Sequence, residues 1–100
     1  MRPMTEKDRM AQSLLYAATA QDVRARETYG HDDAMRAMVF GDANDMRDIA
    51  ALIVKGKIKE AYNAARSMDT GARDYIPDEV YRFMVASGLP QKETDKQRAI

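Results

Sequence analysis

The chain has 100 residues, with 16 basic and 16 acidic side chains, one histidine and no cysteine. The lack of cysteine excludes disulfides, thiolate nucleophiles and zinc–thiolate sites, and it is typical of proteins in a reducing cytoplasm. A formal net charge of zero disfavours a strongly basic nucleic-acid binder, and a chain this short buries one modest core without a deep substrate cavity.

Apolar residues recur at helical spacing along the chain, and no stretch shows the alternation of a strand. The first helix is predicted to begin after Thr5, an N-cap residue, and to end at Gly30 with a positive φ at that glycine. A short second helix is predicted over residues 33–40, capped by Asp32 and stopped by Gly41.

A third helix is predicted from an Asp42 or Asn44 cap through Val54. Gly56 follows it, and the next apolar stripe begins two residues later and continues to Met68, which predicts a fourth helix. One glycine without a preceding strand does not make a phosphate-binding loop. Gly56 is therefore expected to be a helix-to-helix turn.

The stretch "ALIVKGKIKEAYNAA" around this turn is similar to the helix–Gly–helix hairpins of tetratricopeptide-like repeats. Gly56, Glu60 and Ala61 match the G-x-x-x-E-A spacing of those hairpins. No 34-residue period repeats the match, so the resemblance implies only that two antiparallel helices pack closely here.

A fifth helix is predicted to open with Pro77 in its first turn and to stop at Gly88-Leu89-Pro90. The sequence thus predicts an all-α bundle of about five helices in one domain, residues 1–90, followed by a polar, mobile tail over residues 91–100. The apolar stripes predict this core: Met10, Ala11, Leu14, Leu15, Ala17, Ala18, Met35, Met38, Val39, Met46, Ile49, Ala50, Ile53, Ile58, Ala61, Tyr62, Ala65, Met68, Val80, Tyr81, Met84 and Val85.

Acidic residues concentrate in one segment. Residues 31–48 carry five aspartates and two arginines, a net charge of −3. The aspartates are Asp32, Asp33, Asp42, Asp45 and Asp48. Most of them stand at predicted helix starts, where a carboxylate caps the helix. The alternative is an acidic patch that contacts a basic protein surface, with Asp45 and Asp48 presented together because they are three residues apart.

Basic residues concentrate in the following segment. Residues 49–73 carry five cations and two acids, a net charge of +3. The cations are Lys55, Lys57, Lys59, Arg66 and Arg73. One interpretation is a solvated helix face, and the other is a face that contacts nucleic-acid phosphates. The predicted fourth helix lacks a polar cluster at its start that would read base edges.

Two further features leave alternatives open. His31, beside Asp32, invites an acid–base role, but no nucleophile or orienting third group accompanies it, which favours a surface residue. Met35, Met38 and Met46 surround Gly41, where they fill the core or form an adaptable binding surface. The sequence predicts no catalytic residue, cofactor or metal ligand set.

A small, cysteine-free, charge-mixed helical protein with a polar tail resembles the compact accessory proteins of phages, and among these the helical anti-CRISPR proteins. The resemblance covers size, composition and fold class. It implies a non-enzymatic inhibitor that binds a CRISPR effector subunit stoichiometrically. The aspartates of this chain would contact a basic, nucleic-acid-binding surface of that subunit. The alternative is a small phage DNA-binding regulatory protein that uses the basic face.

The expected location is the cytoplasm of a bacterial host. The longest apolar run, "IAALIV" at residues 49–54, is far shorter than the roughly 20 residues of a membrane span. Ala18-Thr19-Ala20 fits a signal-peptidase pattern, but Glu6 and Asp8 oppose the positive start of a signal peptide. A small homo-oligomer is compatible with the sequence, and nucleic acid is not expected as a direct ligand.

Overall fold

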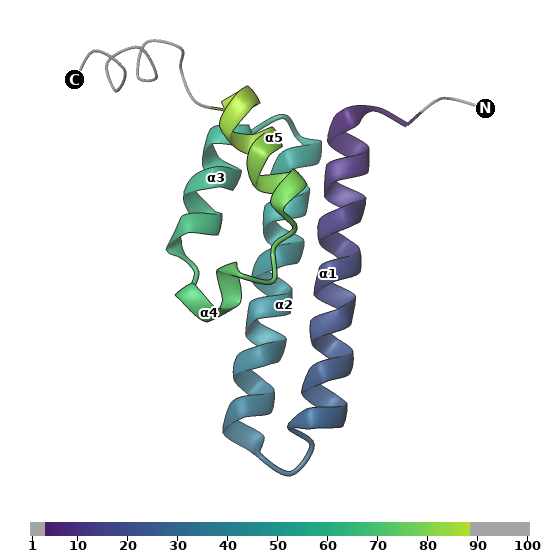
Figure 1. The fold of residues 1–100 in the computed structure, drawn as a ribbon, viewed down its shortest axis with the longest axis vertical. Helices are drawn as coiled ribbons and strands as arrows, with labels where there is room; N and C mark the ends of the chain where they lie inside the picture. The colour runs from purple at the N-terminus through teal and green to yellow at the C-terminus, as the bar shows by residue number, and fades with distance from the viewer. Residues whose placement is uncertain (1–3, 89–100) are drawn as a thin grey trace.

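The computed structural model describes residues 4–88, which are helical apart from short connections (Figure 1). The helices are α1 (Glu6–Thr28), α2 (Asp33–Val54), α3 (Ile58–Ser67), α4 (Thr70–Arg73) and α5 (Asp78–Gly88). The predicted all-α bundle of about five helices is confirmed. The predicted stop at Leu89-Pro90 and the predicted tail over residues 91–100 lie outside the described residues.

The two long helices, α1 and α2, run antiparallel and side by side as a hairpin (Figure 1). Both begin at the predicted caps. Thr5 Oγ1 accepts a hydrogen bond from the Asp8 N–H at 3.1 Å, and Asp32 Oδ1 accepts one from the Met35 N–H at 3.0 Å. The chain turns between the helices at Gly30, whose carbonyl accepts a 2.7 Å hydrogen bond from Arg36. Gly30 lacks the predicted positive φ.

Small side chains line the contact between α1 and α2. Ala11, Ala18 and Ala25 are buried at seven-residue intervals in α1, and Ala43 and Ala50 are buried at the same interval in α2. Such a repeat keeps one stripe of each helix facing the other, and alanine lets the two backbones approach closely. An ion pair between Asp22 and Arg47 also joins the two helices.

The prediction that Gly41 ends a helix is wrong. Residues 33–40 and the predicted third helix form one continuous helix, α2, and Gly41 lies on its exposed side. Glycine costs about 1 kcal/mol relative to alanine inside a helix, but packing against a neighbouring helix outweighs such a local preference. The buried residues Val39, Ala43 and Met46 carry the contact with α1 past Gly41 without a break.

Gly56 is the predicted turn between α2 and α3, and its φ of 80° is the one positive φ among the described residues. The Gly56 N–H donates to the Ile53 carbonyl at 3.0 Å, and the Lys57 N–H donates to the Leu52 carbonyl at 2.9 Å. These two bonds are those of a Schellman motif, which satisfies the last carbonyls of a helix. The chain then reverses, and α3 packs antiparallel to α2 (Figure 1).

The segment from α3 to α5 covers one side of the hairpin over part of its length (Figure 1). The single turn α4 was not predicted from the sequence. It reverses the chain so that α5 contacts both α3 and α1. Ser13 of α1 donates a 2.7 Å hydrogen bond to Glu79 of α5. The largest fully buried side chains are Leu14, Met46, Ile49, Ile53, Val80 and Met84.

Three residues that were predicted for the core are instead exposed. Leu15 is 43% exposed, Met38 47% and Val85 45%. Each lies next in the sequence to a residue that was correctly predicted for the core. The helical periodicity was therefore predicted correctly, but the predicted apolar faces are too wide. Among these three, Met38 lines a groove that is described below.

Two glycine substitutions test the turn and the continuous helix together. We expect Gly56→Ala to lower the free energy of unfolding by about 1 kcal/mol, because a Cβ disfavours a positive φ. Gly41→Ala is the matched control, and it should raise stability by about 1 kcal/mol, since an added Cβ meets no atom within 4 Å there. Thermal unfolding should show shifts of opposite sign, each about 4–8 °C. A Gly41→Ala protein less stable than the wild type would contradict a continuous α2.

Candidate interaction surface

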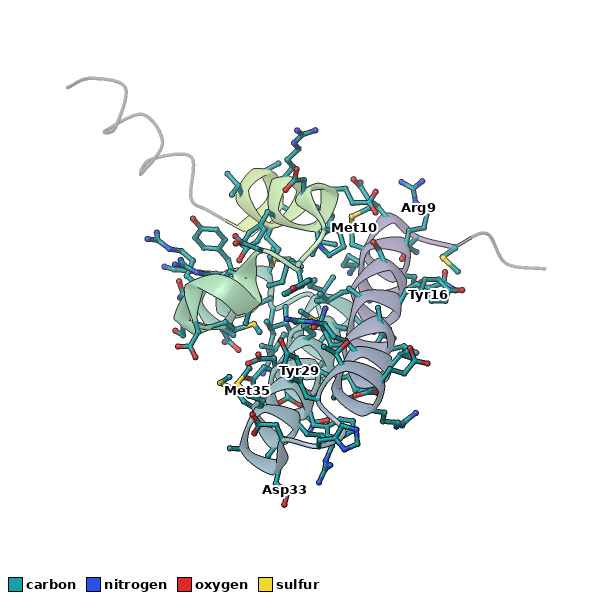
Figure 2. All side chains as sticks on the ribbon, turned by 60° about the horizontal axis from the view of Figure 1, so that its bottom comes forward. Arg9, Met10, Tyr16, Tyr29, Asp33 and Met35 are labelled. Carbon is teal, nitrogen blue, oxygen red and sulfur yellow. The ribbon has the colours of Figure 1, made fainter. Side chains whose placement is uncertain are left out.

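The five aspartates predicted as one patch lie in two separate groups. Asp32 and Asp33 are at the tip of the hairpin, where Asp33 points into solvent (Figure 2). Asp42, Asp45 and Asp48 lie farther along α2, and the 12 residues from Asp33 to Asp45 span about 18 Å of helix. The structure therefore does not bring all five carboxylates together.

The two carboxylates at the hairpin tip already have partners there. Asp32 caps α2 through the Met35 N–H, and Asp33 forms an ion pair with Arg36 at 2.6 Å. Both interactions are local and belong to the start of the helix, where a carboxylate also meets the positive end of the helix dipole. Capping accounts for Asp32, and the local ion pair with Arg36 together with the helix dipole accounts for Asp33.

The second group gains a member that the sequence analysis did not include. Asp42, Asp45 and Asp48 are spaced by three residues, so they occupy successive turns on one side of α2. Asp69, in the connection from α3 to α4, lines one groove together with Asp42. Asp69 belongs to segment 49–73, whose net charge is positive, so the summed charge of that segment does not indicate an acidic residue of this group. We call Asp42, Asp45, Asp48 and Asp69 the acidic group.

The acidic group borders the end of α3. A shallow hollow of about 240 Å³ separates Asp45 and Asp48 from the last turn of that helix. Its lining residues are Asp45, Asp48, Ile49, Ala64, Ser67 and Met68. Both aspartates are exposed, so their carboxylates are accessible from solvent beside an apolar surface.

No member of the acidic group has an ion-pair partner within residues 4–88. The two arginines of segment 31–48 are engaged elsewhere. Arg36 binds Asp33 and the Gly30 carbonyl, and Arg47 binds Asp22 of α1 and Asn44. The acidic group is therefore more negative locally than the summed charge of its segment indicates.

The pKa of Asp42 reflects this environment. Partial burial raises its pKa above the ordinary value of 3.8, and the nearby carboxylates Asp45 and Asp69 raise it further. Arg24 of α1 acts in the opposite direction but has the smallest of these effects. The raised pKa of Asp42 thus reflects first its partial burial and then the carboxylates close to it.

An apolar groove adjoins the acidic group, and we call it the methionine groove. Its volume is about 240 Å³. It is lined by Arg24, Met35, Met38, Val39, Asp42, Asp69, Gly71, Ala72 and Tyr75. The methionines belong to the part of α2 that extends past the end of α3 (Figure 1), and Figure 2 labels Met35 near the hairpin tip. Of the three methionines around Gly41, Met46 is in the core, whereas Met35 and Met38 are partly exposed.

Arg24 anchors the far side of this groove through contacts within the chain. Its guanidinium donates to Gln21 Oε1 and to the Tyr29 hydroxyl, each at 3.1 Å. The same group lies 4.7 Å from the centre of the Tyr75 ring and 5.3 Å from that of Tyr29, in cation–π contacts. Arg24 therefore holds Tyr75 against α1 and shapes the groove.

The predicted basic face also separates into two parts. Lys55, Lys57 and Lys59 surround the turn at Gly56 and are exposed. Arg66 and Arg73 lie toward the other end of α3 and line a separate cavity. The ten residues of α3 span about 15 Å, so the lysines and arginines do not form one compact cluster.

The cavity beside the two arginines has mixed charge. Its volume is about 400 Å³, and it is lined by Tyr62, Arg66, Arg73, Asp74, Ile76, Asp78, Tyr81 and Val85. Burial raises the pKa of the Tyr81 hydroxyl, while Arg73 acts to lower it. Two aspartates line this cavity together with the two arginines, so its formal charges sum to zero and it offers no net positive charge to a phosphate.

His31 is exposed in the hairpin turn. Within residues 4–88, no group of three or more His, Asp or Glu side chains is arranged to hold a metal ion. None of the described helices combines the length and the apolar character that crossing a membrane requires.

Comparisons with protein families, with curated proteins and with solved structures find no match to this chain. Its function is therefore inferred from its own residues.

A pH-dependent stability measurement tests the electrostatics of the acidic group. Because Asp42 binds its proton more tightly in the folded chain, the folded state holds more protons above pH 3.8, and stability falls as pH rises through the raised pKa. Asp42→Asn removes this loss. We expect it to raise stability at about pH 7 by a few tenths of a kcal/mol, the size of a like-charge repulsion on a helix.

The gain should disappear near pH 3, where the carboxyl group is mostly protonated in both states. Asp33→Asn is the control and should lower stability at neutral pH, because it removes the ion pair with Arg36. Denaturant unfolding at both pH values measures these differences. A loss of stability from Asp42→Asn at neutral pH would show that its carboxylate stabilises the fold.

Proposed function

We propose that this protein is a non-enzymatic inhibitor that binds a basic surface of a bacterial nucleoprotein complex, one molecule to one site, in the cytoplasm of the host. The observation that carries the proposal is the acidic group, whose four carboxylates have no ion-pair partner within residues 4–88. Carboxylates without ion-pair partners attract a partner surface rich in lysine and arginine.

Surfaces of that kind occur where a protein binds nucleic-acid phosphates. A protein that places carboxylates on such a surface competes with the nucleic acid for the same cations. An effector subunit of a CRISPR complex is the partner implied by the resemblance to anti-CRISPR proteins. Inhibition by occupancy requires no catalytic residue.

The size of the acidic group limits the kind of surface it fits. Asp42 and Asp48 are six residues apart, so the row on α2 extends only about 9 Å. A row of this length matches a local cluster of basic side chains and not a long nucleic-acid channel. The proposed binding mode is therefore occupation of one basic site and not mimicry of DNA along its length. The zero net charge of the chain agrees with this mode.

The alternative function is a small phage DNA-binding regulator. It would use the residues Lys55, Lys57, Lys59, Arg66 and Arg73. The division of these residues between the Gly56 turn and the mixed-charge cavity favours the inhibitor, because DNA binding needs a continuous basic footprint.

A double substitution on the acidic group tests the proposed function. Asp45→Asn with Asp48→Asn removes two charges and approximately keeps the side-chain shapes. We expect the free energy of unfolding to change by less than about 1 kcal/mol, since exposed charge effects on a helix are small. Affinity for a partner isolated from bacterial lysate, measured by calorimetry, should fall at least about tenfold, which is 1.4 kcal/mol.

The matched control neutralises the other face, with Lys59→Gln and Arg66→Gln, and should leave the affinity within about twofold. An unchanged affinity of the aspartate variant, combined with a loss of affinity in the control, would show that the binding surface is on α3. Binding of random duplex DNA that weakens steeply with added salt would support the DNA-binding alternative instead.

A further inference from the structure

The methionine groove is a mainly apolar surface that residues 4–88 leave partly uncovered. Met38 is 47% exposed and Tyr75 is 43% exposed, and they line the same groove. The groove owes its exposure to the difference in helix length, because α3 has 10 residues beside the 22 of α2. Within residues 4–88, the segment that lines the groove opposite the methionines consists of Asp69, α4 and Tyr75.

The volume of the groove indicates what it can hold. About 240 Å³ is below the roughly 300–1,000 Å³ of typical small-molecule sites. It suits one or two apolar side chains of a protein partner. Methionine adapts its shape to different side chains, and methionine-lined grooves bind the apolar face of amphipathic helices.

The charges around the groove select the partner further. Asp42 and Asp69 are on its rim, and Asp45 and Asp48 continue along α2 by one and two turns. Arg24 is the cation that lines the groove, and it is engaged by Gln21, Tyr29 and Tyr75. A partner that brings an apolar side chain into the groove therefore meets carboxylates beside it, and lysine or arginine neighbours complement them.

We propose that the methionine groove and the acidic group form one docking surface for a basic amphipathic helix. An apolar side chain of that helix enters between Met35, Met38 and Tyr75, and its lysines or arginines lie against the four aspartates. This inference rests on the proposed function, because it assigns a partner class to the same surface. The raised pKa of Asp42 is consistent with it, since an added cation relieves the repulsion among the carboxylates.

Methionine methyl groups provide a direct test with the full-length chain. The probe is a synthetic helix-forming peptide of about 15 residues, with leucine on one face and lysine on the other. The protein, labelled with ¹³C at its methionine methyl groups, is titrated with this peptide. We expect the Met35 and Met38 resonances to shift and saturate, whereas Met46 and Met84, which are fully buried, stay in place.

Three comparisons make the test specific. A peptide with glutamate in place of lysine should bind at least tenfold more weakly. Met38→Gln should weaken binding of the lysine peptide at least tenfold, while Val54→Gln, which changes an equally exposed apolar residue of α2 outside the groove, should change it less than twofold. Asp42→Asn combined with Asp69→Asn should weaken the binding and reduce its salt dependence.

The outcomes separate this inference from the proposed function. Stationary Met35 and Met38 resonances, or equal binding by the wild type and Met38→Gln, would overturn the docking surface even if partner capture depends on Asp45 and Asp48. Peptide binding that follows all three comparisons supports the docking surface. This support holds even if substitution of Asp45 and Asp48 leaves the affinity for the captured partner unchanged. In that case the proposed inhibitory function is wrong.

Discussion

The alanine-lined contact between α1 and α2 is the constraint from which the rest of the structure follows. Alanines at seven-residue intervals hold two long helices close together, and they leave a flat pair of helices with one face to be covered. The segment α3–α5 covers that face only in part, since α3 is less than half as long as α2. The methionine groove, with Met35, Met38 and Asp42, lies at this partly covered end, and Asp69 of the covering segment lines the same groove.

The arrangement of charge depends on the same hairpin. Arg47 turns toward α1 to pair with Asp22, and Arg36 turns toward the hairpin tip to pair with Asp33. Each arginine stabilises the hairpin and is thereby removed from the side of α2 that carries Asp42, Asp45 and Asp48. Three members of the acidic group lie in segment 31–48 and Asp69 is the fourth, and none of the four has an ion-pair partner among residues 4–88. Under the proposed function, these carboxylates would favour a partner with a basic surface.

The sequence was sufficient for the helical class, for the caps at Thr5 and Asp32 and for the turn at Gly56, because each depends on local backbone chemistry. The prediction of a helix end at Gly41 was wrong, because glycine is only a local signal. The helical spacing of Val39, Ala43 and Met46 continues through that position and indicates one helix. Asp69 could not have been assigned to the acidic group, because chain reversal after α3 brings it beside Asp42. The pairing of Arg36 and Arg47 likewise depends on side-chain directions that summed charge does not contain.

Carboxylate footprinting of the complex with the captured bacterial partner tests the central claim, that the acidic group belongs to the binding surface. Carbodiimide labelling, read by mass spectrometry, reports the accessibility of each carboxyl group in the free and bound protein. The account predicts that labelling of Asp45, Asp48 and Asp69 falls on binding, while that of Asp33 and Glu60, which are exposed elsewhere, stays the same. Protection of Glu60 with continued labelling of Asp45 and Asp48 would contradict it.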